Sequence, residues 1–146
     1  MSRDPLATPT VTPDPAPDAA PVITVSAVAL VRDGAVLTVR KRGTQRFMLV
    51  GGKPEAGESP EQCIRRETTE EVGLVLGEVD VLGEFTSEAA NEPGHRLVST
   101  VFTADLPGEP VAAAEIAELR WTPLDSTHDD LAPMLEFHVL PLLRAR

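Results

Sequence analysis

A glycine-rich loop followed by a short amphipathic helix is the sequence feature that most constrains the fold of this chain. The segment covers residues 51–74 and reads GGKPEAGESPEQCIRRETTEEVGL. Ser59 and Gln62 have the spacing of a capping box, and Pro60 suits the first position of a helix. Gly73 can adopt the left-handed conformation that closes a helix. The sequence therefore predicts a helix that begins at Pro60 and ends just before Gly73.

Three carboxylates lie on the face of this helix that is expected to pack inward. When successive residues are placed about 100° apart, Glu67, Glu70 and Glu71 fall within a quarter-turn that also contains Cys63 and Ile64. Partly buried like charges repel one another, and either raised pKa values or a cation must relieve the repulsion. Mg²⁺ and Mn²⁺ prefer oxygen ligands, so we expect these glutamates to hold such an ion. The alternative is a solvated acidic helix face, which the glycine loop and the apolar residues of the same arc disfavour.

The glycine loop and the residues before it suggest further contacts. A backbone carbonyl of Gly51 or Gly52 is a candidate neutral metal ligand, because glycine lets the backbone come close to an ion. Four cationic residues precede the loop in a chain whose net charge is −10; they are Arg40, Lys41, Arg42 and Arg46. Arginine can bind phosphate oxygens with two parallel hydrogen bonds, so we predict that the three arginines bind substrate phosphates. An ordinary charged strand end is the open alternative.

The spacing of these residues resembles the Nudix box of the Nudix hydrolases, written G-x5-E-x7-R-E-U-x-E-E-x-G-U with U apolar. The matching positions are Gly52, Glu58, Arg66, Glu67, Glu70, Glu71, Gly73 and Leu74. One position departs from the box, because Thr68 stands where an apolar residue is expected. Threonine is close to valine in shape, so we expect slightly weaker helix packing and intact chemistry.

The resemblance implies an α/β fold of the Nudix type, an α/β/α sandwich with a central mixed sheet. It also implies an enzyme that uses water and a divalent metal to split a nucleoside diphosphate linked to another group. In such a site Glu67 is the candidate general base, with Arg66 orienting the carboxylates and Glu70 completing the catalytic set. A Nudix-fold sensor that binds a nucleotide without cleaving it is the alternative, although such a module would be expected to lose box carboxylates.

Two further acidic positions follow from the resemblance. Glu58 is expected to orient the loop rather than to bind metal directly. Members of the family often carry an additional acidic ligand or base late in the chain, where this sequence reads PVAAAEIAELRWTPL. Glu115 is the first candidate for that position and Glu118 the second. Whether Glu67 or Glu115 is the base, and how many metal ions bind, stays open.

The remaining sequence predicts strands and a closing helix around this segment. Two β-branched runs joined at Asp33 and Gly34 predict a hairpin. VDVLGEFTS and HRLVSTVFTADL have strand patterns, and the polar loop EAANEPG between them is either a solvated turn, which we favour, or a substrate contact. DDLAPMLEFHVLPLLRAR predicts a helix that Pro141 kinks or ends.

Composition excludes several classes of protein. The net charge of −10 leaves no basic face for a nucleic-acid polymer. The single cysteine, Cys63, allows no intramolecular disulfide. The sequence has neither a membrane-spanning apolar run nor a signal-peptide core, so we expect a cytoplasmic protein without membrane contact. Residues 1–21 contain six prolines and predict a disordered tail, which leaves residues 22–146 as the Nudix domain. Whether the chain is a monomer or a homodimer is left open.

Substrate identity is not determined at this level. A small nucleotide is expected, and nucleoside triphosphates, sugar nucleotides, ADP-ribose and dinucleoside polyphosphates all stay open. The chain has no tyrosine, and its aromatic residues that could stack on a base are Phe47, Phe85, Phe102 and Trp121. We expect most of them to belong to the hydrophobic core.

Overall fold

The computed structural model describes residues 21–90 and 92–146, so the predicted tail lies outside the described residues except for Pro21. The described residues form six strands, one helix in the middle of the chain and a helical C-terminal end. In chain order the elements are β1 (Val22–Arg32), β2 (Ala35–Lys41), β3 (Met48–Gly52), α1 (Pro60–Val72), β4 (Val79–Glu88), β5 (Arg96–Ala104), β6 (Ile116–Pro123), η3 (Leu135–Val139) and α2 (Leu140–Arg144).

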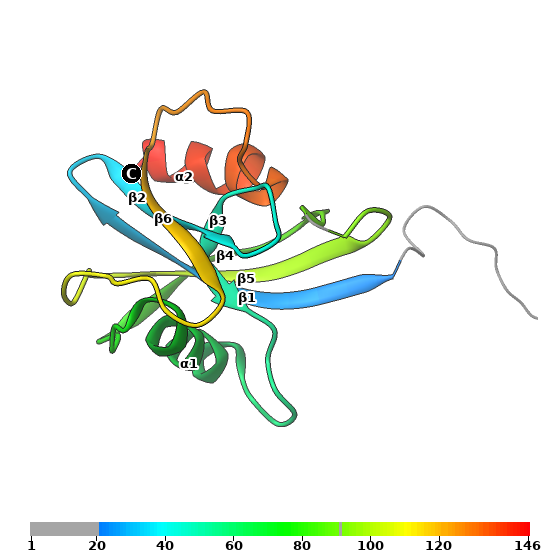
Figure 1. Cartoon of the computed structure of the whole chain (residues 1–146), viewed down its shortest axis with the longest axis horizontal. Helices are drawn as coiled ribbons and strands as arrows, with labels where there is room; N and C mark the ends of the chain where they lie inside the picture. The colour runs from blue at the N-terminus through cyan, green and yellow to red at the C-terminus, as the bar shows by residue number, and fades with distance from the viewer. Residues whose placement is uncertain (1–20, 91) are drawn as a thin grey trace, which may run out of the picture.

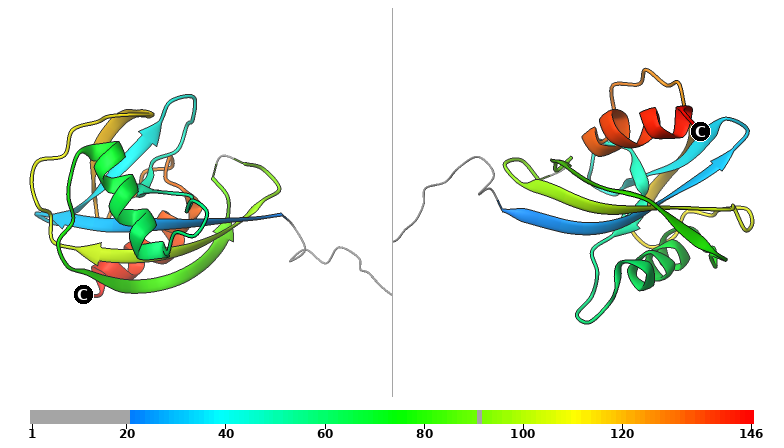
Figure 2. Two further views of the ribbon diagram at one scale, coloured as in Figure 1. Left: turned by 90° about the horizontal axis from the view of Figure 1, so that it is seen from below. Right: turned by 180° about the vertical axis from the view of Figure 1, so that it is seen from behind.

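The strands form one mixed sheet in the order β4-β5-β1-β3-β2-β6. The strands β1 and β5 pair in parallel, and the other neighbouring strands pair antiparallel. The helix α1 covers one face of this sheet, and η3 and α2 cover the other, as Figures 1 and 2 show from opposite sides. This arrangement confirms the predicted α/β/α sandwich with a central mixed sheet.

Both predicted strand pairs are present. Asp33 and Gly34 have φ angles of 53° and 77°, which gives the tight hairpin turn expected for this dipeptide. The hairpin is short, because β1 and β2 pair near the turn and β3 then pairs with both strands. The strands β4 and β5 pair along nearly their whole length, and the loop 89–95 connects them.

The C-terminal helix continues through Pro141. Helical structure runs without a break over residues 133–144, so Pro141 does not end the helix, and the alternative, a kink at this residue, stays a prediction. Proline lacks the N–H that a regular helix needs at this point. The chain forms a wider π-helical turn over Leu135–Val139, in which the N–H of Leu140 donates to the carbonyl of Leu135. This turn directly precedes the proline and lets the helix continue. Among the described residues, no helix has the length and apolar character needed to cross a membrane.

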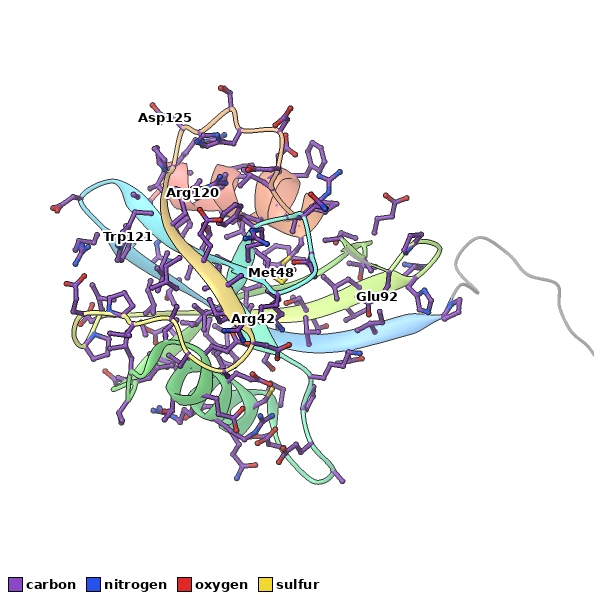
Figure 3. All side chains as sticks on the ribbon, in the orientation of Figure 1. Arg42, Met48, Glu92, Arg120, Trp121 and Asp125 are labelled. Atoms are coloured by element: carbon purple, nitrogen blue, oxygen red, sulfur yellow. The ribbon has the colours of Figure 1, made fainter. Side chains whose placement is uncertain are left out.

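The aromatic residues mostly serve the fold, as expected. Phe47 and Phe102 are buried. The guanidinium of Arg120 lies 3.7 Å from the ring centroid of Phe47, and an arginine of β1 covers Trp121 in the same manner at 4.2 Å; Arg120 and Trp121 lie along β6 in Figure 3. Phe85 stacks on a histidine of η3 with ring centroids 5.8 Å apart.

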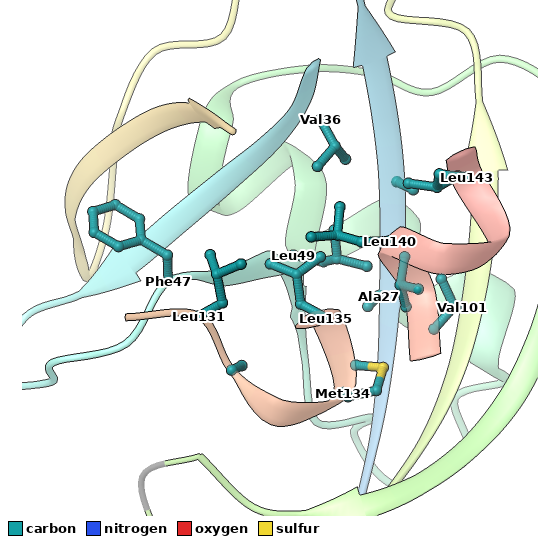
Figure 4. Packing of buried hydrophobic residues seen from close by; sticks show 13 residues of the cluster. Ala27, Val36, Phe47, Leu49, Val101, Leu131, Met134, Leu135, Leu140 and Leu143 are labelled. Carbon is teal, nitrogen blue, oxygen red and sulfur yellow. The ribbon is translucent and has the colours of Figure 1, made fainter. Parts of the chain in front are cut away.

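Two hydrophobic cores lie on opposite faces of the sheet. Successive side chains of a strand point to opposite faces, so one strand contributes residues to both cores. On β1, Ala27 and Ala29 face the core beneath the C-terminal helix, whereas Val28 and Leu30 face the core beneath α1. Figure 4 shows the first of these cores, where Leu135 and other side chains of the C-terminal helix meet the sheet. Because β1 is covered on both faces, its middle is a continuous apolar run rather than an alternating one.

Candidate active site

The helix α1 has the ends that its sequence predicts. The hydroxyl of Ser59 accepts from the N–H of Gln62 at 3.1 Å, and the N–H of Ser59 donates to the Gln62 side chain at 2.9 Å. Gly73 closes the helix with a φ of 72°. Thr68 is buried, and its hydroxyl donates to the carbonyl of Ile64 at 2.6 Å. The hydroxyl of Thr68, which stands where the box has an apolar residue, therefore has a hydrogen-bond partner inside the helix and lowers the helix stability only slightly.

The three carboxylates predicted to bind metal on α1 lie in different environments. The side chain of Glu71 is 1% exposed, that of Glu67 is 12% exposed and that of Glu70 is 53% exposed. Glu71 therefore lies beneath the sheet, Glu67 at the edge of the buried region and Glu70 at the surface. A quarter-turn of one helix thus presents carboxylates at three depths.

Arg66 connects the glycine loop with the helix carboxylates. Its guanidinium donates to both oxygens of Glu58, at 2.7 and 2.8 Å, and to the carbonyl of Lys53 at 3.1 Å. It also donates to Glu67 and to Glu70, at 3.2 Å each. Because one planar group contacts all these oxygens, Arg66 fixes the position of the loop relative to the helix.

Glu58 is held as an anion within this network. Its hydrogen bonds from Arg66, together with one from the N–H of Glu55 at 2.9 Å, lower its pKa to about 2. The hydrogen bond to Glu58 also raises the pKa of Arg66. Both oxygens of Glu58 are used within the protein, so the geometry agrees with the loop-orienting role expected for this residue.

Glu71 is a buried carboxylate that lacks one hydrogen bond. Its Oε1 accepts from the N–H of Gly51 at 3.4 Å, whereas its Oε2 is buried and has no hydrogen-bond partner among the described residues. The ammonium of Lys41 lies 3.4 Å from Oε2, within ion-pair distance. Burial raises the pKa of Glu71 to about 7; Lys41 opposes this shift and the neighbouring Glu67 adds to it. An unpartnered buried carboxylate oxygen is the kind of atom that a cation would stabilise.

In the metal-free protein we expect this carboxyl group to make stability depend on pH. Burial raises the pKa of Glu71 from the ordinary value of 4.5 to about 7. A carboxyl group of this kind contributes stability below its unfolded pKa and loses it as the pH rises through its folded pKa. The free energy of unfolding should therefore fall by about 2 to 3 kcal/mol between about pH 4.5 and about pH 8 through this group.

The measurement is urea unfolding in the presence of a chelator across this pH range, for the parent and for Glu71→Gln. Glutamine has nearly the same shape and cannot ionise, so the variant should lose this component of the pH dependence. Apart from Glu71, the charged groups that give the formal net charge of −10 are the same in both proteins. Their contribution to the pH dependence of unfolding is therefore present in both profiles. Parallel profiles for the two proteins would contradict the assignment.

A cavity of about 450 Å³ opens beside this network. Its walls come from β1, β3, the glycine loop, α1, the β4–β5 loop and the start of the C-terminal helix. Met48 and Glu92, labelled in Figure 3, lie on two of these walls. Aliphatic side chains form much of the surface, and none of its lining residues is aromatic within the described part of the chain.

The cavity brings together some of the predicted site residues and not others. Gly51, Gly52, Arg66, Glu67 and Glu115 line it. Within the described residues, the other predicted members do not line the cavity; they are Arg40, Arg42, Arg46, Glu70 and Glu71. Of the three box carboxylates on α1, Glu67 is thus the one that lines the cavity.

The three arginines make contacts with the protein itself. Arg40 donates to the carbonyl of Thr44 at 3.0 Å and pairs with the second acidic candidate, Glu118, at 3.3 Å. Arg46 donates to the carbonyl of Leu131 at 2.9 Å. Arg42 donates to the carbonyl of Ala114 at 2.6 Å. Binding of substrate phosphate by these arginines stays a prediction.

Glu115 reaches the cavity because its loop is attached to the end of α1 and to β2. The N–H of Ala113 donates to the carbonyl of Glu71 at 2.9 Å, and the N–H of Arg42 donates to the carbonyl of Glu115 at 2.8 Å. Ala114, the residue between, has a φ of 52°, a left-handed conformation that costs energy for a residue with a Cβ. Arg42, which contacts Ala114, therefore helps to hold the loop that carries Glu115.

From sequence, Lys41 is one of the four cationic residues before the loop but not one of the predicted phosphate-binding residues, although the cavity wall includes it. Strand alternation could have identified it. On β2, Leu37 and Val39 face the core beneath α1, so the same period places Lys41 on the face toward α1. The arginines were preferred for their ability to bind phosphate with two hydrogen bonds, a criterion that ignores which face each residue occupies.

The oxygen donors of this region are of the type that a hard divalent cation prefers, although the glutamate side chains are paired with Arg66 and Lys41. In the described part of the chain, no three acidic, histidine or cysteine side chains are gathered closely enough to hold a metal ion. The carboxylates instead contact cationic side chains: Arg66 contacts Glu67 and Glu70, and Lys41 contacts Glu71. The unpartnered Oε2 of Glu71 and the carbonyl of Gly51 are oxygen donors of the kind that Mg²⁺ prefers.

Comparison with known proteins gives matches over most of the chain. A family model described as the NUDIX domain matches residues 20–143. The ADP-ribose pyrophosphatase of Methanocaldococcus jannaschii is 30% identical over 101 residues, which cover 67% of this chain and 59% of that protein. The NAD-capped RNA hydrolase NudC of Mycobacterium tuberculosis is 36% identical over 118 residues, 77% of this chain and 36% of that protein. The chain thus spans less than two thirds of the length of either relative.

A solved structure shows the same architecture. The crystal structure of the MutT NUDIX hydrolase from Burkholderia pseudomallei matches with a TM-score of 0.68 and 26% sequence identity. The match covers 86% of this chain and 98% of that chain. The likeness therefore includes the sheet and the helices on both of its faces.

Proposed function

Because this chain belongs to the NUDIX family, we propose that it is a divalent-metal-dependent pyrophosphohydrolase acting on a small nucleotide. The substrate is a nucleoside triphosphate or a nucleoside diphosphate derivative, and water cleaves its diphosphate linkage. Attack at phosphorus releases a nucleoside monophosphate and a phosphorylated remainder, or pyrophosphate from a triphosphate. The observation that carries the proposal is the position of Glu67 on the wall of a 450 Å³ cavity, with Arg66 bound to it.

The chain's own residues have distinct proposed tasks. Glu67 takes a proton from the attacking water, because its carboxylate faces the cavity and Arg66 holds its orientation. Arg66 positions Glu67 and Glu70 rather than contacting the reacting atoms. Glu115 lies on the same cavity wall and is the rival base or an additional ligand.

The proposed metal ligands are the carbonyls of Gly51 and Gly52 and the carboxylates of Glu67, Glu70, Glu71 and Glu115. The orphaned buried oxygen of Glu71 supports this assignment. A bound Mg²⁺ or Mn²⁺ would supply positive charge to the diphosphate oxygens and make a water molecule easier to deprotonate.

A panel of nucleotides tests the proposed function. Purified protein is incubated with nucleoside triphosphates, ADP-ribose, a sugar nucleotide and a dinucleoside polyphosphate, each with Mg²⁺, with Mn²⁺ and with a chelator. Anion-exchange chromatography then identifies the products. We expect at least one compound to be cleaved at its diphosphate linkage in metal and none in chelator. ADP-ribose is the first compound to test, because a relative that is 30% identical is an ADP-ribose pyrophosphatase.

The same panel separates the enzyme from the sensor alternative. A sensor would gain thermal stability from one of the nucleotides, because a ligand that binds the native state stabilises it, and would leave that nucleotide intact. Absence of cleavage throughout the panel, in both metals, would contradict the proposed function. Glu67→Gln serves as the control for contaminating hydrolases, since a contaminant's activity would persist in that preparation.

A further inference from the structure

The side-chain ammonium of Lys41 lies between two oxygens that are proposed metal ligands. Its Nζ is 3.4 Å from the carbonyl oxygen of Gly51 and 3.4 Å from Oε2 of Glu71. Lys41 enters this position from the end of β2, on the sheet face that α1 covers. Its side chain is 22% exposed and forms part of the cavity wall, so it has room to move outward.

Both contacts of the Lys41 ammonium are long. Hydrogen bonds between an ammonium and a carboxylate are normally about 2.7 to 2.9 Å long, so both contacts of Lys41 are loose. Oε2 of Glu71 is buried and has no hydrogen-bond partner within the described chain. A small divalent ion carries twice the charge of an ammonium and approaches oxygen ligands to about 2.0 to 2.1 Å. It would therefore satisfy the same two oxygens better than Lys41 does.

We propose that Lys41 is an exchangeable internal cation, which neutralises Glu71 and donates to the Gly51 carbonyl in the metal-free protein and is displaced into the cavity when a divalent ion binds. The inference rests on the proposed function, because it takes Gly51 and Glu71 as ligands of that ion. Lys41 has no role in the proposed hydrolysis. Its ammonium would stabilise the metal-free fold and weaken the binding of the divalent ion.

The first effect is on the metal-free fold. Without Lys41, the buried carboxylate of Glu71 would face Glu67 with no cation at 3.4 Å, and a buried charge without its partner is strongly destabilising. The second effect is on metal affinity. Binding the divalent ion breaks the contacts of Lys41 and brings two like charges close together, so removing the ammonium removes both costs.

Lys41→Met tests the inference, because methionine keeps much of the length of the side chain and removes its charge. Thermal unfolding is measured in chelator and during a titration with Mn²⁺, and calorimetry gives the dissociation constant. A buffer of about pH 8.5 keeps protons from competing with the ion. We expect the metal-free melting temperature to fall by about 5 °C and the variant to bind Mn²⁺ about tenfold more tightly than the parent. At saturating Mn²⁺ the two melting temperatures should converge.

Two matched variants control for the loss of a side chain. Lys41→Arg keeps a positive charge at the same position and should behave more like the parent than Lys41→Met does. Lys53→Met removes another lysine of the cavity wall, whose ammonium lies 3.9 Å from Glu92 instead of Glu71. It should leave both the metal-free melting temperature and the Mn²⁺ affinity at the parent values.

If Lys41 only stabilised the fold, the melting temperatures of the parent and Lys41→Met would not converge at saturating Mn²⁺. A deficit of Lys41→Met that persists at saturating Mn²⁺ would overturn the inference, as would an unchanged or weaker affinity. A parent protein that gains no stability from metal would overturn it as well. None of these measurements uses hydrolysis, so a protein that cleaves no nucleotide can still show the exchange.

Discussion

Replacing Glu67 with glutamine is expected to lower kcat by about 10² to 10⁴-fold, the usual cost of losing a general base. Glu67 faces the cavity, and Arg66 donates to its carboxylate at 3.2 Å. Glutamine is nearly isosteric, so the melting temperature should change little and KM should rise far less than kcat falls. The measurement is steady-state kinetics at saturating Mg²⁺ on the best substrate of the panel.

Two glutamates provide the comparison for this variant. Glu115 shares the cavity wall with Glu67, whereas Glu70 is half exposed and contacts Arg66. We expect Glu70→Gln to be the mildest variant and Glu115→Gln to be intermediate. If Glu115→Gln is the most damaged enzyme, the base lies on the loop before β6. If Glu67→Gln weakens Mn²⁺ binding in calorimetry as much as it lowers kcat, the lost activity comes from the role of Glu67 as a metal ligand, and Glu67 is not the base.

Substituting the two glycines of the loop with alanine should damage different properties. A Cβ on Gly51 would overlap the backbone carbonyl of Ser26 on β1, and backbone in the middle of a sheet cannot move away. Gly51→Ala should therefore lower the free energy of unfolding by at least about 3 kcal/mol, the upper end of the usual cost of overpacking. A Cβ on Gly52 would instead overlap the carboxylate of Glu67, the mobile end of a side chain.

Gly52→Ala should consequently keep the fold and lose activity. A displacement of about 1 Å in a catalytic group can cost about 10²-fold in rate, and we expect a loss of this order in kcat. Urea unfolding and steady-state kinetics on both variants make the test. Gly57→Ala is a third comparison, because its Cβ would meet no neighbouring atom and its φ of 79° makes the cost one of backbone strain alone. Equal loss of stability in Gly51→Ala and Gly52→Ala would contradict the expectation that Gly51 is needed for the fold and Gly52 for activity.

The pair of glycines therefore has a structural explanation that differs from the one the sequence suggests. From sequence, both residues are expected to let the backbone approach a metal. In the structure, Gly51 allows β3 to pair closely with β1, and Gly52 makes room for the carboxylate of Glu67. The carbonyl of Gly51 also accepts from Lys41, so a metal-binding role for it is compatible with its packing role.

Local features of the sequence predicted local structure well. Ser59, Gln62 and Gly73 defined both ends of α1, because capping and the left-handed closing residue depend on neighbours within one turn. Asp33 and Gly34 predicted the hairpin turn for the same reason. Of the two predicted effects of Pro141, an end of the helix is wrong, because its missing N–H can be accommodated by a π-helical turn, which depends on how the whole C-terminal helix packs.

The sequence by itself determined the family resemblance and the helix with its carboxylates, since both follow from spacing along the chain. Periodicity predicted only a mixture of strands and helices, and the layers of the fold were implied by the resemblance. Tertiary structure alone decided the depth of each carboxylate and which cations meet them. Glu67, Glu70 and Glu71 occupy one arc of α1, yet β3 covers Glu71 and leaves Glu70 at the surface. Lys41 reaches Glu71 from a strand thirty positions earlier, because side-chain electrostatics act through space and sheet pairing brings distant residues together.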